Sequence, residues 1–508
     1  MAFKEIKKGF AKYPHTVVTF ICVVIAVLST FVPEAVGPAN NGDFMRVIHP
    51  NKIRFADGNP RTMWQGYGFT PGFTMDFSDS DALITRALYF IQTDFTYFDF
   101  PSSQVLTIKL SKIINVGINI LTNKPLSTYN LFGLFIIHLA IYAAAIHLIL
   151  GYVYRRFGIK IFIFSAFTAI FVLSDQGYTM YFNSFYGEPL QYALTLLAIG
   201  LLLRLEEKRS GKLIFYYAAV YLMATSKFAW IPVGILFALA PLGFMPLKNT
   251  GFSRGKLIAF SGGTVFALII FYSLFIPIWI ERDTSFTAVF DGVLRNSQTP
   301  EQDLEWLGID SKYSVLQHWQ AYFEDYPFDI ESDEFKREFF DVISKPRILM
   351  FYLRHPSRFI NILQESAGYA RYIRAPYLTG VQNPDYWGQQ EYRFSLWENA
   401  RIRMAPLANF WFIAVVLAAA MVLGAVKFIR IIKYRQSGIS PVLPLLLFIL
   451  AASAAGSFVL PYLSNGIADQ AKQLFGFINL FDIIIFTLLG CLVYRVDFKK
   501  LLRLGLGK

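Results

Sequence analysis

Long apolar blocks separated by polar segments run along most of the chain, and they predict membrane-spanning helices. A helix of about 20 apolar residues crosses a bilayer. The pattern predicts about ten such spans, within a range of nine to twelve, at residues 16–33, 131–153, 161–174, 189–203, 213–226, 229–245, 257–280, 406–426, 441–461 and 474–494. Several of these blocks are short, so their helices are expected to extend into flanking polar positions.

Two long polar segments interrupt the predicted spans, at residues 34–130 and 281–405. The first contains an apolar stretch, 104–121, in which Lys109 and Lys112 share a helical face. This pattern suits a helix that lies in the membrane interface rather than an eleventh span. The second segment has ordinary charge and helix-like runs, which predict a small, mainly helical domain.

The predicted fold is therefore an all-α polytopic membrane protein in five parts. These are residues 1–33 (N-terminus and first span), 34–130 (first loop with interfacial helices), 131–280 (spans two to seven), 281–405 (inserted domain) and 406–508 (last three spans and basic tail). The spans divide seven to three around the inserted domain, which argues against the inverted repeats of many secondary transporters.

Composition and charge give this membrane protein an orientation. The chain is 55% hydrophobic and 16% charged, whereas soluble domains carry about 25% charged residues. Its net charge of +12 gathers in the short loops on one side of the predicted spans, for example at Arg155, Arg156 and Lys160. Basic loops mark the cytoplasmic side. We therefore expect a plasma-membrane protein with both termini in the cytoplasm, both long segments outside, membrane lipids as partners and no nucleic acid.

The first candidate site residue is Asp43, in the segment Asn41-Gly42-Asp43-Phe44-Met45-Arg46 just beyond the first span. Asn-Gly favours a tight turn, which would fix Asp43 near the outer membrane surface. Arg46 could pair with Asp43 or with a substrate phosphate. A solvated aspartate on a surface turn is the alternative.

A second candidate cluster lies in the short outer loop between spans three and four, which reads YFNSFYGEP at residues 181–189 and opens with Asp175. Glu188 precedes a proline that would begin a helix, where the helix dipole favours a carboxylate. Beside it, Asn183 and Tyr186 could bind a sugar. Aromatic side chains are also ordinary at membrane interfaces.

Basic residues provide two further candidates, both for a phosphate. Lys227 stands at the outer tip between spans five and six, where a lysine usually reaches toward lipid headgroups. In the inserted domain, Arg371 and Arg374 are three residues apart and are expected to share a helical face, followed by Tyr377. Two guanidinium groups suit a phosphate or diphosphate, although a salt-bridged face is the plainer alternative.

Several common catalytic motifs are missing from the sequence. The chain has no Walker loop, no dinucleotide-binding glycine motif, no zinc-protease motif and no Cys/His cluster. No predicted cytoplasmic loop is long enough for a nucleotide-binding domain. A transferred group would therefore have to come from a donor available outside, where nucleotide sugars are absent, and a lipid-linked donor meets that requirement.

On these residues the chain resembles the C-type (GT-C) integral membrane glycosyltransferases, in which an acid follows the first span. Its NGDF at Asp43, NSFYGEP at Glu188 and SKFAW at Lys227 resemble hexose transferases of bacterial surface-glycan clusters, of the WsfD type. The resemblance implies a GT-C-like fold, a polyprenyl-phosphate hexose donor, a glycan acceptor, an inverting transfer and Asp43 as the general base. Gly42 stands where a second acid would complete a two-carboxylate metal site. A divalent cation (Mg²⁺ or Mn²⁺) held by Asp43 with Asp175 or Glu188 stays open, and no other cofactor is expected.

The resulting hypothesis gives each candidate a role. The catalytic carboxylates are Asp43, as the general base, and Glu188. The donor phosphate is bound by Lys227, Arg46, Arg374 and Arg371. The sugar or acceptor is bound by Tyr186, Asn183 and Tyr377, and Trp387 and Trp397 also contact the acceptor. Three alternatives stay open: a lipid-linked glycan transporter, which would need charges within its spans; a non-catalytic part of a glycan export system; and a ligase or polymerase that uses a lipid diphosphate.

Overall fold

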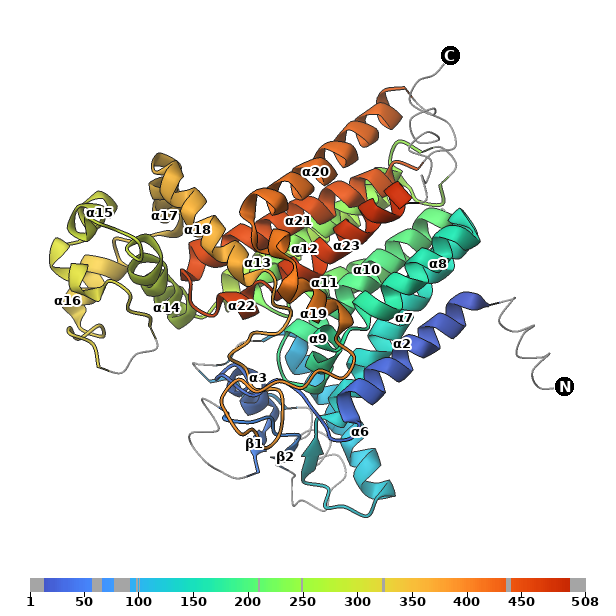
Figure 1. Cartoon of the computed structure of the whole chain (residues 1–508), viewed down its shortest axis with the longest axis horizontal. Coiled ribbons are helices and arrows are strands. Elements are labelled where there is room, and N and C mark those ends of the chain that lie inside the picture. The colour runs from blue at the N-terminus through green and yellow to red at the C-terminus, as the bar shows by residue number, and fades with distance from the viewer. Residues whose placement is uncertain are drawn as a thin grey trace.

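The structure is a computed structural model, and it describes residues 13–56, 66–76, 92–96, 99, 101–208, 211–247, 250–321, 325–434 and 440–493. The N-terminal lysines and the basic tail on which part of the predicted orientation rests lie outside these residues. The chain forms a bundle of long helices with loops and short helices gathered at one end (Figure 1). We call this the loop-rich end and the other the opposite end.

Each of the ten predicted spans corresponds to helical structure. The helices are α2 (Pro14–Phe31), α7 (Phe132–Phe157), α8 (Ile159–Thr168), α10 (Glu188–Lys208), α11 (Leu213–Ala224), α12 (Ile231–Leu239), α13 (Arg254–Phe275), α20 (Phe410–Lys433), α21 (Val442–Asn465) and α23 (Phe475–Val493). Among the described residues, eight helices are long and apolar enough to cross a membrane, or nine if one bent pair is a single span. The chain is therefore a multi-pass membrane protein.

The bent pair is the predicted span 161–174 with the segment that follows it. Helix α8 continues as a π-helix over Ala169–Leu173, and α9 (Gln176–Thr179) with a 3₁₀ turn over Met180–Asn183 leaves it at 55°. The side chain of Asp175 caps α9 by accepting from the backbone N–H of Gly177 at 2.8 Å. An N-cap of this kind satisfies a backbone donor that a helix start leaves unpaired. The sequence therefore favours the start of a new helix at the bend between α8 and α9.

The first loop contains a small antiparallel sheet that the all-α prediction lacks. Its strands β1 (Ile53–Phe55), β2 (Gly72–Met75) and β3 (Thr128–Asn130) pair in that order. In the register, Phe55 faces Phe73 and Phe73 faces Tyr129. All three rings are buried, so the sheet presents one apolar face to the bundle.

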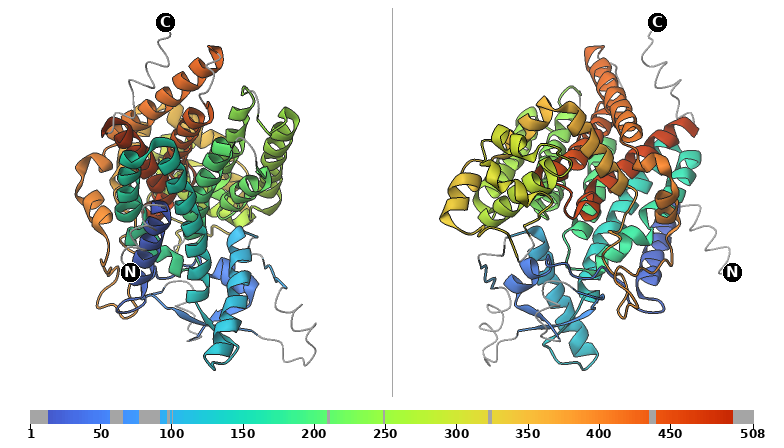
Figure 2. Two further views of the ribbon diagram at one scale, coloured as in Figure 1. Left: turned by 90° about the vertical axis from the view of Figure 1, so that its right-hand side faces the viewer. Right: turned by 60° about the vertical axis from the view of Figure 1, so that its left-hand side comes forward.

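Helix α6 (Ser103–Leu121) is the predicted interfacial helix, and by length and composition it also meets the requirement for a span. The backbone N–H of its Ser103 donates to the carbonyl of Thr225 at 3.1 Å, and near its other end Asn119 donates to the carbonyl of Thr128 at 2.7 Å. Both of these partners lie at the loop-rich end, where Figure 2 shows α6 beside the sheet in both views. These contacts fit the interfacial placement.

The two faces of α6 differ. Lys112 is buried and donates to the carbonyl of Asn51 at 3.0 Å, while Lys109 donates to Thr93 at 2.6 Å. This face therefore holds the first loop. The other face exposes an apolar stripe formed by Leu106, Leu110, Ile113 and Ile120. An apolar stripe opposite a polar face is typical of a helix that lies in a membrane interface.

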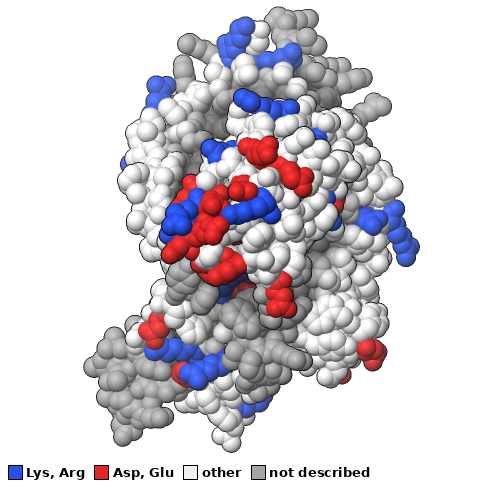
Figure 3. Space-filling view, turned by 90° about the vertical axis from the view of Figure 1, so that its left-hand side faces the viewer, with Lys and Arg blue, Asp and Glu red and all other residues white. Residues whose placement is uncertain are grey.

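The segment between α13 and α20 is mainly helical, as predicted. Its helices are α14 (Ile278–Ala288), α15 (Pro300–Leu307), α16 (Asp333–Phe335), α17 (Lys345–Arg354), α18 (Pro356–Tyr369) and α19 (Leu396–Arg403). Two short helices outside this segment, α3 (Met45–Ile48) and α22 (Gln470–Gln473), also lie at the loop-rich end. Aromatic rings form part of its core, with Phe290 stacked on Phe339 at 5.0 Å. Its surface intersperses acidic and basic side chains (Figure 3). Among them, Lys312 pairs with Glu334 at 2.7 Å.

One ion pair lies deep in the protein and was not predicted. Asp482 in the middle of α23 pairs with Arg401 of α19, and both side chains are fully buried. Asp482 also accepts from the hydroxyl of Tyr178 at 2.6 Å and from the indole N–H of Trp397 at 2.5 Å. A buried charge is tolerated when it is paired and hydrogen-bonded, so this pair fastens α19 to the bundle.

Candidate functional site

The turn that carries Asp43 is held by its neighbours in the sequence. Oδ1 of Asn40 accepts from the backbone N–H groups of Gly42 at 2.9 Å and of Phe44 at 3.1 Å. Gly42 has a φ of 97°, which L side chains rarely adopt. The buried ring of Phe44 packs on Tyr186 at 4.8 Å. The predicted tight turn exists, and it presents Asp43 at the loop-rich end of the bundle.

Two cations flank the carboxylate of Asp43. The ammonium of Lys472 lies 2.6 Å from Oδ2, and the guanidinium of Arg46 lies 2.9 Å from Oδ1. Burial alone would raise the pKa of Asp43. The charges of Lys472 and Arg46 outweigh that effect and hold the pKa far below its ordinary value, and Lys227 acts in the same direction. Asp43 is therefore ionised at neutral pH.

Lys472 is the centre of the cluster, and the sequence prediction missed it. Its side chain is buried and also pairs with Asp469 at 2.7 Å, and its ammonium lies 5.2 Å from the ring centroid of Tyr186. Burial lowers the pKa of Lys472, but Asp43 and Asp469 outweigh it and hold that pKa well above the ordinary value. Both Lys472 and Asp469 lie just before the last span. The same signal that singled out Lys227, a lysine beside the end of a predicted span, applied to Lys472.

Glu188 and Lys227 form a second ion pair beside the first. Glu188 begins α10, as predicted, and its buried carboxylate accepts from the ammonium of Lys227 at 2.8 Å. The backbone at Ser226 lies against Gly187, where a Cβ would stand 2.7 Å from the Ser226 carbonyl oxygen. Glu188 also acts electrostatically on Lys472. The structure thus brings Asp43, Glu188 and Lys227 together, as the sequence hypothesis requires.

Two of the predicted sugar-binding residues join this cluster through hydrogen bonds. The hydroxyl of Tyr186 donates to the carbonyl of Ala39 at 2.7 Å and lies 2.9 Å from Oδ1 of Asn41. The hydroxyl of Tyr377 donates to Asp469. Tyr377 is partly exposed and Tyr186 is buried, so Tyr377 is the one of the two that a ligand can reach in this conformation.

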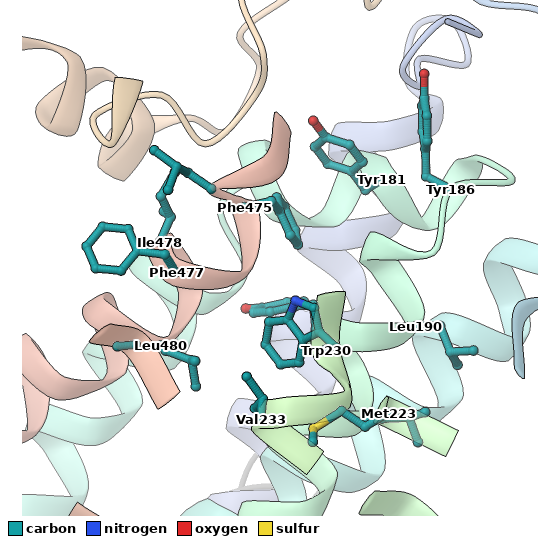
Figure 4. Close-up of a cluster of buried hydrophobic side chains, with 14 of the residues drawn as sticks. Tyr181, Tyr186, Leu190, Met223, Trp230, Val233, Phe475, Phe477, Ile478 and Leu480 are labelled. Carbon is teal, nitrogen blue, oxygen red and sulfur yellow. The ribbon is translucent and has the colours of Figure 1, made fainter. Parts of the chain in front are cut away.

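Apolar side chains form the floor under the charged groups. Figure 4 shows the hydroxyl groups of Tyr181 and Tyr186 pointing away from a cluster that includes Trp230 and Phe475. At this floor, a Cβ on Gly476 would stand 2.1 Å from Trp230 and 2.4 Å from the amide nitrogen of Gln191. The charged cluster is therefore backed by tight packing, which limits how far its residues can move.

Two predicted site residues, Arg374 and Asn183, have structural roles instead, and Arg371 lies outside the helix expected for it. Arg374 is buried, forms a two-pronged salt bridge with Glu398 and donates to the carbonyl of Glu391 at 3.0 Å, so its donors are not available for a phosphate. Arg371 lies with it beyond the end of α18 at Tyr369, so the predicted shared helical face is wrong. Asn183 is fully buried and donates to the carbonyl of Val36 at 2.9 Å, so it anchors the first loop and does not face a sugar.

The residues do not fit the divalent cation that the sequence left open. Asp175 is fully buried, and its second oxygen accepts from the backbone N–H groups of Trp397 at 2.8 Å and Glu398 at 3.2 Å. Asp43 faces two cations, which repel a metal ion. Within the described part of the chain, no three His, Cys, Asp or Glu side chains are grouped so that they could hold a metal.

Comparison with known proteins gives one match. A family model described as the YfdI N-terminal transmembrane domain matches residues 2–503. No curated protein matches the chain. No solved structure matches it either.

Proposed function

The chain belongs to the YfdI N-terminal transmembrane domain family, and from this premise we propose that it is a GT-C-like membrane glycosyltransferase. It moves a hexose from a polyprenyl-phosphate donor to a surface glycan or a lipid-linked acceptor, with inversion. The observation that carries the proposal is the ionised Asp43 flanked by Lys472, Arg46 and Lys227 at the loop-rich end of a membrane bundle. A carboxylate beside several cations suits chemistry in which a proton is accepted while a phosphate leaves.

The proposed orientation places the loop-rich end outside the cell. Basic residues lie in the last turn of helices that end at the opposite face: Arg155 and Arg156 in α7, Lys208 in α10, and Arg430 and Lys433 in α20. Basic residues mark the cytoplasmic side, and this supports the proposal that both termini are in the cytoplasm and that the protein lies in the plasma membrane.

In the proposed reaction, an acceptor hydroxyl attacks the anomeric carbon of the donor sugar. Asp43 accepts the hydroxyl proton, an assistance worth about 10²–10⁴-fold. The bond between the anomeric carbon and the phosphate oxygen breaks, and its electron pair stays on the departing polyprenyl phosphate. Lys227, Lys472 and Arg46 stabilise the negative charge that develops there. Lys472 thus replaces Arg374 in the sequence hypothesis.

The cations paired with Asp43 also determine how its pKa changes when a donor binds. A donor phosphate competes with the carboxylate for Lys472 and Arg46. Each contact that passes to the phosphate raises the pKa of Asp43 toward its ordinary value, since the charges that lower it are then shared. The donor therefore strengthens the base at the moment it is needed.

An exposed aromatic pair supports an acceptor position near the same end. Trp387 and Tyr67 are 44% and 49% exposed, and their ring centroids lie 5.6 Å apart. Exposed rings of this kind suit the apolar faces of sugars. Trp397, which the sequence hypothesis also gave to the acceptor, instead donates to Asp482 and packs on Phe486, so it belongs to the core.

The test is sugar transfer or donor hydrolysis by the purified full chain in detergent, with radiolabelled polyprenyl-phosphate hexoses. Wild type is compared with Asp43→Asn and with Asp341→Asn, an exposed aspartate of the helical segment that serves as a matched control. Turnover that survives in the control and is lost in Asp43→Asn, with folding retained, supports the proposal. Equal activity in all three keeps the enzyme class and rejects Asp43. Movement of lipid-linked glycan across vesicles without any transfer favours the transporter.

A further inference from the structure

A cavity of about 400 Å³ lies at the end of the bundle that is opposite to the candidate site, between α7 and α10. It is lined by His147, Leu148, Arg155, Arg204, Glu207 and Lys208. Pockets that hold small molecules measure roughly 300–1,000 Å³. The cavity is therefore large enough for a phosphate with a short polar group attached, and no role proposed above uses it.

The charges that line this cavity favour an anion. Arg155 donates to both oxygens of Glu207, at 2.5 and 2.8 Å, and this pair is close to neutral. Arg204 and Lys208 are exposed and add two positive charges beside it. The neighbouring acid, Glu206, is buried and accepts from the hydroxyl of Tyr152 at 2.7 Å. The lining thus carries a net positive charge.

Two histidines stand beside the charged groups. The rings of His15 on α2 and His147 on α7 lie 4.7 Å apart. His15 is 9% exposed, and within the described residues its Nδ1 has no hydrogen-bond partner. His147 lines the cavity and its ring contacts that of His15, so α2 backs this wall of the cavity.

Apolar residues surround the cavity, which favours a lipid over a free anion as its ligand. Phe157 and Ile159 lie two and four positions after Arg155 and are 39% and 55% exposed. They lie at the end of a membrane helix, where acyl chains meet headgroups. Basic pockets between membrane helices bind the headgroups of anionic lipids. Cations at helix C-termini are also favoured by the helix dipole, but the dipole does not account for a cavity.

We propose that this cavity binds the phosphodiester headgroup of an anionic phospholipid, with Arg204 and Lys208 as its main contacts. The proposal does not rest on sugar transfer, because the cavity lies at the other end of the bundle. A bound lipid would join α2, α7 and α10 at the face where these helices end or begin.

The test uses the full chain in detergent, with phosphatidylglycerol, phosphatidylcholine and glycerol 3-phosphate as three separate probes. Lipid binding is measured by native mass spectrometry, and protection by thermal unfolding. Phosphatidylglycerol is expected to bind and to raise the unfolding temperature, while the other two probes do neither. Each positive charge near an anionic lipid raises the affinity for that lipid about fivefold. Arg204→Gln is expected to weaken binding by about that factor, and the double variant with Lys208→Gln by about 25-fold.

Two control variants test whether a loss of binding is specific to the charges that line the cavity. Arg204→Lys retains the charge and should bind as wild type does. The pair Arg430→Gln and Lys433→Gln removes two exposed charges from the end of α20 and should leave binding unchanged. Equal binding of both lipids, equal protection by glycerol 3-phosphate, or equal losses in the α20 variant would each overturn the proposal. The last of these would show attraction to the charged membrane face as a whole.

Discussion

Lys472 donates a hydrogen bond of 2.6 Å to Asp43, although the two residues stand 429 positions apart in the sequence. The first loop and the segment before the last span thus meet in one ion pair. Both residues lie in a cluster that also contains the Glu188–Lys227 pair. Any role of Asp43 in chemistry depends on this distant lysine.

Replacement of Lys472 is expected to impair turnover and to change its pH dependence. In Lys472→Gln, the loss of one charge that stabilises the leaving phosphate should lower kcat by about 10²-fold or more. The pKa of Asp43 should rise toward its ordinary value, because its largest opposing charge is gone. Activity that needs ionised Asp43 would then fall off at a higher pH on the acid side. The measurement is the pH–rate profile, with exposed Lys336→Gln as the control.

The buried pair of Arg374 and Glu398 should be structural rather than catalytic. Arg374→Met leaves Glu398 buried without its partner, which typically costs about 3–5 kcal/mol of stability. The double variant Arg374→Met/Glu398→Met should recover most of that loss. Thermal unfolding in detergent measures both, with exposed Arg403→Met as the control. A double variant as unstable as the single one would contradict this account.

Gly476 should tolerate no side chain. A methyl group there would stand 2.1 Å from Trp230, so the floor of the candidate site must shift. Overpacking of this kind costs about 1–3 kcal/mol. Gly476→Ala is expected to lower the unfolding temperature and to reduce turnover, whereas Gly263→Ala, in open space on α13, should change neither. A normal unfolding temperature in Gly476→Ala would show that the floor is looser than its geometry indicates.

Because of Lys345, the free energy of unfolding should rise as the pH increases from about 7 to about 10. Burial lowers the pKa of its ammonium to about 7, and the carboxylate of Glu281 offsets only part of that effect. A lysine in the unfolded chain has a pKa of about 10.4. Between these values the unfolded chain binds a proton that the native chain lacks, so stability rises with pH. The cost of the buried charge is fully present below about pH 7 and disappears toward about pH 10.

The measurement is the unfolding temperature of wild type and Lys345→Met across this range of pH. The unfolding temperature of wild type, relative to that of the variant, should rise as the pH increases from about 7 to about 10. Lys336→Met, at an exposed position, controls for general effects of charge. A difference that stays constant with pH would show that Lys345 keeps its proton.

Local signals predicted much of this molecule. Apolar blocks located the helices, and a turn, a helix start and a hairpin tip located Asp43, Glu188 and Lys227. The sheet was missed because its strands have only three or four residues, too few for a clear alternation. Arg371 and Arg374 were misplaced because α18 ends at Tyr369, before either residue.

Long-range partners were the least accessible to sequence reasoning. Glu398 as the partner of Arg374, and Asp469 with Lys472 as partners in the site, depend on which loops meet in space. Spacing along one helix says nothing about that. The charge on Lys472 was visible in the sequence, but its burial between two acids was not.

The buried pair of Arg401 and Asp482 has a consequence for how the protein is made. Asp482 stands 81 positions after Arg401, in the last described helix, so the ribosome completes Arg401 first. A lone aspartate at the centre of an inserting helix costs about 2.5–3.5 kcal/mol. Tyr178 of α9 offsets part of that cost, and the charge itself is paired when α19 docks against the inserted α23. Membrane insertion of α23 and docking of α19 are therefore a single coupled event.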